Sequence, residues 1–252
     1  MSLRLRSELR LHLSQGRCAA EVWPAGWSRL PRAAICVEGE GDLVAKVLAR
    51  LVAERVRLPQ QVHLVLADEL LFYALLPADA AWGQAGAHAR RYFEGALGGE
   101  ELQIALTLSP CGRRWIAVAV EAAQMLRVTE PLAVHGLRLV ATESALLRDI
   151  DGLGSRVPTD GVLVVVRTWG TMLLRRERRG WTELSWERCT LQAPGELVRR
   201  IAALAARHAH AAGHAAAPVL VALENAQEAG RMAPLVQQRG WKLCSVRPGE
   251  VL

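Results

Sequence analysis

The sequence of 252 residues lacks any hydrophobic run long enough to cross a membrane. A transmembrane helix needs roughly 18–20 consecutive apolar residues, whereas the longest apolar runs here, Val162–Val166 and Ala215–Leu223, have the length of strands. The first residues, Met1–Arg6, also lack the apolar core of a secretory signal peptide. These absences predict a soluble cytosolic protein, and with 51% hydrophobic residues the chain has enough apolar content for a packed core.

Cysteine pairs and metal-binding cysteine motifs are missing as well. The five cysteines are odd in number, widely scattered and never spaced as CxxC: Cys18, Cys36, Cys111, Cys189 and Cys244. This spacing argues against a disulfide framework and against a zinc site. We therefore expect reduced thiols and no bound metal.

Lysine is almost absent, since only Lys46 and Lys242 are present and arginine supplies the rest of the net charge of +6. Arginine in place of lysine, in a chain rich in alanine, is typical of a GC-rich coding sequence. We therefore interpret the charge as a mildly basic solvated surface and expect no nucleic-acid partner.

What the sequence does contain is one order of elements that occurs twice. The first copy comprises strands at 8–13, 18–23 and 33–37, a helix over 42–57 and a strand at 62–67. The second comprises strands at 162–166, 171–175 and 181–188, a helix over 196–212 and a strand at 218–223. Alternating and helical hydrophobic periodicities carry these assignments. A duplicated β-β-β-α-β order predicts an α/β protein with the two-lobed, actin-like (ribonuclease H-like) fold.

Additional elements lie between the two copies. Strands at 71–76, 102–108 and 115–120 and a helix over 79–97 predict an extra subdomain at about 70–120. A helix from Glu121, kinked at Pro131, leads to a strand at 137–142 and a short helix at 143–150. The glycine-containing stretch Asp151–Pro158 is expected to be a linker. We predict a first lobe at 1–150 and a second at 151–252, followed by a last helix (226–239) and strand (241–246).

The segment from Val62 to Ile150 carries a family resemblance. It reads VHLVLADELLFYALLP, AHARRYFEGAL, LQIALT, WIAVAV and GLRLVATESALLRDI in that order. This block resembles the actin-like pilus-assembly protein PilM and the cytoplasmic domain of the type II secretion protein GspL. The resemblance implies a scaffold at the inner membrane that binds the cytosolic N-terminal tail of a bitopic membrane protein and contacts the assembly ATPase. It also implies that the subdomain borders the peptide groove, which makes Trp82, Tyr92 and Phe93 candidate contacts.

The expected nucleotide cleft lacks acidic loops. An actin-like ATPase needs carboxylates near the phosphates for Mg²⁺ and hairpin turns that approach the phosphates closely. The turns here are 14–17 and 167–171, and neither holds an acid. Asp68 and Glu69 follow a strand, but neighbouring strand residues point apart. We predict no catalytic residue, no metal and no cofactor.

The alternative is a nucleotide-binding protein or ATPase with a divergent site, in which Arg17 and Arg167 hold an anion. Its candidate residues are Ser14, Gly16, Arg17, Arg167, Thr168, Gly170 and Thr171.

Two further clusters have ordinary explanations. His208, His210 and His214 are poorly spaced for a metal and suit the negative end of a helix dipole. The basic run 175–179 could bind nucleic acid or lipid headgroups, but a hairpin turn at Arg179-Gly180 would place Arg176 opposite Glu183, as in a solvated ion-paired edge.

Overall fold

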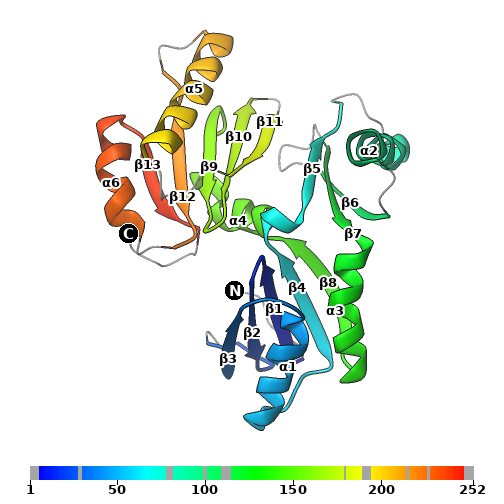
Figure 1. Cartoon of the computed structure of the whole chain (residues 1–252). Helices are drawn as coiled ribbons and strands as arrows, with labels where there is room; N and C mark the ends of the chain where they lie inside the picture. Colours follow the sequence, from blue (N-terminus) through cyan, green and yellow to red (C-terminus); the bar gives the residue numbers. More distant parts are fainter. Residues whose placement is uncertain are drawn as a thin grey trace. The chain divides into compact units, whose positions relative to one another are not determined.

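The computed structural model describes residues 6–27, 30–77, 82–98, 101–108, 115–178, 180–188, 194–213, 216–225 and 228–246. Its strands form two five-stranded sheets and one three-stranded sheet (Figure 1). The chain divides into two compact units. Unit 1 comprises Met1–Leu71, Glu100–Gln103 and Val120–Ala145, and unit 2 comprises Phe72–Gly99, Ile104–Ala119 and Leu146–Leu252.

Unit 1 contains a five-stranded mixed sheet in the order β3-β2-β1-β4-β8. Its strands are β1 (Glu8–Ser14), β2 (Arg17–Trp23), β3 (Ala33–Glu38), β4 (Gln61–Leu66) and β8 (Arg138–Ser144). The alternation in β1 buries Leu9, Leu11 and Leu13 on one face, as the two-residue period of a strand requires. Helix α1 (Leu43–Ala53) packs on β2 and β3, α3 (Ala122–Val134) packs on β8, and the two helices touch.

Unit 2 repeats this topology, which confirms the predicted duplication. The sheet order is β11-β10-β9-β12-β13, from β9 (Gly161–Val166), β10 (Thr171–Glu177), β11 (Gly180–Glu187), β12 (Val219–Leu223) and β13 (Lys242–Ser245). Helices α5 (Pro194–Ala212) and α6 (Ala229–Gln238) contribute Leu197, Ile201 and Met232 to the core on this sheet. Every residue of β9 and β12 is buried, as expected for central strands of a sheet that is covered on both faces.

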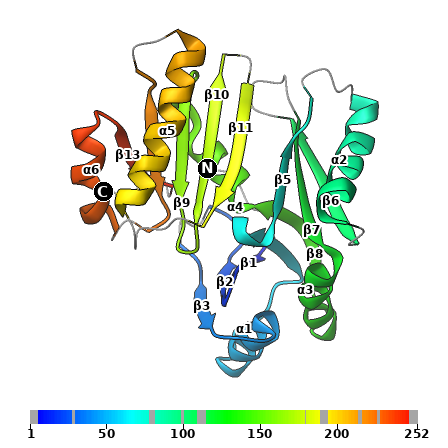
Figure 2. The same ribbon diagram turned by 45° about the horizontal axis from the view of Figure 1, so that its top comes forward.

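The predicted extra subdomain is present as a three-stranded sheet in the order β5-β7-β6 (Figure 2). Its elements are β5 (Phe72–Leu75), α2 (Trp82–Leu97), β6 (Leu102–Leu108) and β7 (Trp115–Glu121). Ala85, Ala89 and Phe93 of α2 are buried. Within unit 2, β5 also lies alongside β11.

Some predicted boundaries are wrong. Glu143 and Ser144 pair with Val65 and Leu66 of β4, so β8 runs two residues further and α4 (Ala145–Leu153) begins later. The expected linker at 151–158 is mostly helical, since α4 reaches Leu153 and a 3-10 turn, η2, covers Gly154–Arg156.

A helix end and a strand register also differ from the prediction. Helix α1 ends at Ala53 rather than near residue 57, and Arg55 then adopts a positive φ of 56°. In the β10–β11 hairpin an irregularity between Arg175 and Arg176 places Glu183 opposite Arg175, not opposite Arg176. Asp79, predicted as the cap of the subdomain helix, lies outside the described residues.

Candidate functional site

The first hairpin turn of the repeat lies at the rim of a pocket within unit 1. Gln15 and Gly16 form a two-residue turn in which Gly16 has a φ of 74°, a conformation that glycine adopts without strain. The pocket has a volume of about 530 Å³ and is lined by Leu13, Ser14, Gln15, Gly16, Gly41, Asp42, Leu43, Val44, Leu70, Gln124, Arg127 and Val128. It is large enough for a small ligand, and its wall includes the start of α1.

A carboxylate lies beside this turn and accepts a hydrogen bond from its backbone. The backbone N–H of Gln15 donates to Oε1 of Glu69 at 3.1 Å. Glu69 belongs to the 3-10 turn η1 (Asp68–Leu70), which directly follows β4, and Asp68 beside it is fully buried. The turn itself holds no acid, as the sequence indicates, but η1 places one beside it. Glu69 therefore already uses a backbone donor that a phosphate bound at this turn would need.

The two arginines predicted as anion ligands each contact a carboxylate. The Nε atom of Arg17 lies 3.7 Å from Oε1 of Glu38 across the β2–β3 pair and also donates to the sulfur of Cys36. The Nη1 atom of Arg167 lies 2.6 Å from Oδ2 of Asp149 in α4, and the two side chains are only 4% and 13% exposed. An anion at either arginine would have to compete with the protein's own carboxylate.

The second turn is held by close packing as well as by this ion pair. The N–H of Arg167 donates to the carbonyl oxygen of Gly170 at 2.8 Å. A Cβ atom on Gly170 would lie 2.4 Å from the ring of Trp186 and 2.7 Å from the carbonyl oxygen of Glu187, so only glycine fits there. Thr168 and Trp169 are exposed at the tip, whereas Thr171 is buried.

A second recess lies at the outer strand of the unit 1 sheet. Within the described ranges, β8 pairs only with β4, and no strand pairs with its other edge. The groove along it has a volume of about 290 Å³ and is lined by Gln103, Met125, Leu126, Thr129, Leu139, Val140, Ala141 and Thr142. Leu126 and Val140 are large apolar side chains that remain 54% and 41% exposed. Sequence reasoning missed this groove, although the alternation in β8 contained a signal.

The predicted aromatic surface is only partly available to a partner. Phe93 is buried in the core under α2, whereas Tyr92 is 54% exposed and meets the Phe93 ring edge-on with centroids 5.5 Å apart. Trp82 begins α2, and its side chain lies outside what the structure describes. Of these three predicted contacts, Tyr92 is the one whose described side chain faces solvent.

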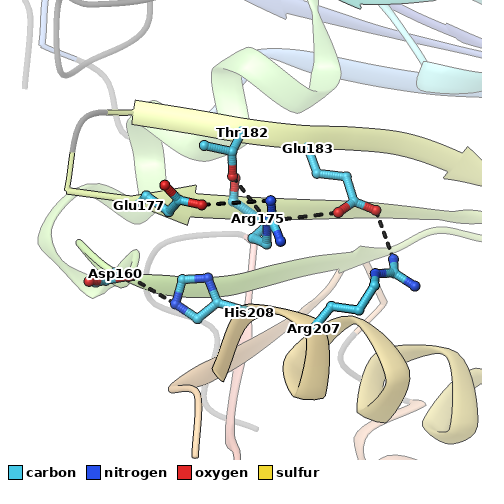
Figure 3. A network of polar contacts seen from close by, with 7 residues as sticks. All are labelled: Asp160, Arg175, Glu177, Thr182, Glu183, Arg207 and His208. Atoms are coloured by element: carbon cyan, nitrogen blue, oxygen red, sulfur yellow. Dashed lines mark hydrogen bonds and ion pairs between the residues drawn. The ribbon is translucent and has the colours of Figure 1, made fainter. Parts of the chain in front are cut away.

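Arg175 of the basic run and His208 each take part in polar contacts within unit 2 (Figure 3). Arg175 lies near Glu183 and Glu177 and donates to Thr182, and Arg207 of α5 binds Glu183 at 2.8 Å. His208 is fully buried, with Nε2 2.8 Å from Oδ1 of Asp160. The dipole interpretation is therefore wrong for His208, which is held by a carboxylate that is distant in the sequence.

His210 is exposed in the last turn of α5, and His214 lies outside the described residues.

Neither a metal cluster nor a membrane helix is found in the described ranges. They hold no group of three or more histidine, cysteine or carboxylate side chains arranged to bind a metal. None of their helices combines the length and the apolar composition that a bilayer crossing requires.

No protein-family model and no curated protein sequence matches the chain. Solved structures do match. One is a Bacteroides thetaiotaomicron protein with an actin-like ATPase fold and unknown function: identity is 11%, the TM-score is 0.61, and the match covers 98% of this chain and 93% of that one. The PilM–PilN type IV pilus biogenesis complex matches at 14% identity and a TM-score of 0.64, covering 96% and 88%.

The cytoplasmic domain of EpsL, an inner-membrane component of the type II secretion system of Vibrio cholerae, matches at 15% identity. Its TM-score is 0.55, and the match covers 86% of this chain and 82% of that one. The predicted actin-like, duplicated fold is confirmed, and the fold is the one shared with PilM and the EpsL domain.

Proposed function

We propose that this protein is a non-enzymatic cytoplasmic scaffold of a machine related to type IV pilus or type II secretion assemblies. It binds the cytosolic tail of a bitopic inner-membrane protein and is held at the membrane through that partner. The observation that carries the proposal is the groove along β8, with its unpaired edge and exposed apolar side chains. The shared fold with PilM, whose solved structure is a complex with PilN, supports it.

Strand addition explains how such a groove holds a tail. An extended peptide that pairs with an outer strand gains main-chain hydrogen bonds, and pockets for its alternate side chains supply specificity. Beside β8, Leu126 and Met125 of α3 offer an apolar wall on the sheet. A tail with apolar residues at alternate positions would bury Leu126 and Val140, which are otherwise exposed to water at a free-energy cost.

The environments of the two turns support a scaffold without catalysis. Glu69 accepts a hydrogen bond from the backbone N–H of Gln15 at the first turn, and Asp149 forms an ion pair with Arg167 at the second. At the first turn a phosphate would find this backbone donor already used, and at the second turn an anion would have to compete with Asp149 for Arg167. We accordingly propose that the protein works without a nucleotide or metal cofactor.

The alternative of a nucleotide-binding protein or ATPase rests on one observation. The pocket of about 530 Å³ lies beside Ser14 and Gly16 and includes Arg127, an exposed cation. Titration calorimetry with Mg·ATP, followed by a phosphate-release assay, decides between the two functions. The scaffold proposal predicts no heat of binding and no turnover, and measurable turnover would overturn it.

A peptide-binding assay tests the scaffold directly. The probe is a fluorescent peptide with the tail sequence of a single-span membrane protein encoded beside this chain. Leu126→Glu and Val140→Glu each place a charge in the apolar groove and should weaken binding about tenfold or more. The matched control is Val134→Glu, because Val134 is exposed on the same helix α3 and does not line the groove.

Equal losses in all three variants, or no binding by the wild type, would refute the proposal. The assembly ATPase is the second proposed partner, and co-purification with the tail-bound protein tests it.

A further inference from the structure

Strand β6 is an outer edge without the protection that natural edge strands usually carry. It is the last strand of the sheet β5-β7-β6, and in the described part of the chain no strand pairs with its outer side. Its seven residues, Leu102–Leu108, include neither proline nor any charged residue. The outer strands of the two five-stranded sheets, β3, β8, β11 and β13, each carry at least one charge, and the uncharged outer strand β5 lies alongside β11. Uncharged edges are templates for pairing with another chain.

The sequence of β6 is chemically symmetric about its centre. LQIALTL places Ala105 in the middle, Ile104 and Leu106 on either side, and the polar residues Gln103 and Thr107 beyond them. In an antiparallel pairing of two identical strands about Ala105, every residue would face one of its own kind: Ala105 itself, Ile104 with Leu106, Gln103 with Thr107. Pairing with an unrelated peptide would make no use of this symmetry, whereas pairing with a second copy places like residues opposite each other.

The groove beside β6 is also suited to a second copy. It has a volume of about 490 Å³ and lies between α2 and the strand, lined by Gly86, Ala87, Arg90, Arg91, Glu94, Ile104 and Leu106. The charged residues Arg90, Arg91 and Glu94 carry both signs. A two-fold axis brings such a rim against itself, so that Glu94 of each copy can pair with an arginine of the other.

We propose that two copies of this chain associate through β6, which joins their three-stranded sheets into one antiparallel sheet around a two-fold axis at Ala105. Ile104 then lies opposite the partner's Leu106, and the small Ala105 lets the two strands approach closely. Ile104 and Leu106 line the groove beneath α2, so Ala105, which is exposed, lies on the other face of the sheet. This dimer is separate from the peptide groove at β8, with which it shares only Gln103.

Cysteine crosslinking tests the predicted register in a background where Cys36, Cys111, Cys189 and Cys244 are serine. Facing residues of antiparallel strands have Cα atoms about 4.5–5.5 Å apart, within the range that a disulfide spans. Ala105→Cys should therefore form a covalent dimer under mild oxidation. Gln103→Cys alone should not, because its partner is Thr107 of the other copy, whereas a mixture of Gln103→Cys and Thr107→Cys should crosslink.

Charge substitution tests the association without crosslinking. In sedimentation over a roughly hundredfold concentration range, the wild type should shift from monomer to dimer. Ala105→Lys and Ala105→Glu should each remain monomeric, because like charges would face each other across the axis, while their equimolar mixture should recover a dimer. Recovery excludes misfolding as the cause, and tail binding unchanged in both variants separates this inference from the proposed function.

A wild type that stays monomeric throughout would overturn the proposal. Crosslinks that form as readily at Gln103→Cys alone as at Ala105→Cys would overturn it as well.

Discussion

Replacing Asp149 with alanine should destabilise unit 2 far more than an ordinary surface mutation does. The carboxylate lies 2.6 Å from the guanidinium of Arg167, and both side chains are almost wholly buried. Removing Asp149 takes from this buried cation the carboxylate 2.6 Å away, and breaking a buried pair in this way costs about 3–5 kcal/mol. In a chain of this size such a loss lowers Tm by roughly 10 °C. Urea denaturation followed by tryptophan fluorescence measures it, since Trp181 and Trp186 lie in unit 2.

The matched control is an exposed pair. Arg50 and Glu54 lie 3.3 Å apart on α1 with side chains 58% and 49% exposed, so Glu54→Gln should cost less than about 0.5 kcal/mol. The double variant Asp149→Leu with Arg167→Met removes both charges and should recover much of the loss, because apolar replacement of a buried pair is often neutral. A free energy of unfolding for Asp149→Ala within about 1 kcal/mol of the wild-type value would refute this prediction.

Asp149→Ala also tests the account of the second turn. If the carboxylate fills the place of an anion, inorganic phosphate should raise the Tm of the variant and leave that of the wild type unchanged. Equal responses of the two proteins would show that Asp149 does not shield Arg167.

The remaining predictions concern packing, a buried histidine and thiol reactivity. Gly170→Ala should cost about 1–3 kcal/mol in urea unfolding, because its Cβ would collide with Trp186; Gly195→Ala, with open space around its Cβ, should be neutral or slightly stabilising. His208→Ala should cost about 2–4 kcal/mol, since it opens a cavity and strips Asp160 of a contact, whereas the exposed His210→Ala should stay within about 0.5 kcal/mol; equal effects would contradict the buried network. Burial, with smaller effects of Cys36 and Asp42, raises the pKa of Cys18 from 9.0 to about 12, so mass spectrometry at pH 8 should find maleimide on the exposed Cys36 and none on Cys18. The same pKa shift predicts that stability is unaffected below pH 9 and falls as pH rises toward 12, because the unfolded chain loses this proton first; modification of native Cys18 at pH 8 would refute the assignment.

The element order was predictable because it depends on local periodicity. Leu9, Leu11 and Leu13 alternate along β1, and Val44, Val47, Leu48 and Leu51 repeat at helical spacing in α1; both patterns can be recognised from neighbouring residues alone. The duplicated topology then followed from the repetition of that order.

What could not be predicted depends on contacts between residues distant in sequence. Glu69 contacts Gln15, which is 54 residues away in the sequence, and Asp160, just before β9, contacts His208 of α5. The boundary between β8 and α4 depends on the pairing of Glu143 with Val65 of β4, which local helix preference does not reveal. Both turns lack an acid, as the sequence indicates, but the position of Glu69 beside the first turn could not be predicted for the same reason, because Glu69 follows another strand.

The most direct test of the central claim is a photocrosslinking map with the cytosolic tail of the proposed membrane partner. A tail peptide with a photoreactive residue at each apolar position in turn is bound and irradiated, and the attached peptides are identified by mass spectrometry. The account predicts that crosslinks concentrate on 125–129 of α3 and 139–142 of β8, the two walls of the groove. Crosslinks confined to the pocket beside Ser14 and Gly16, or spread over the surface without preference, would contradict it.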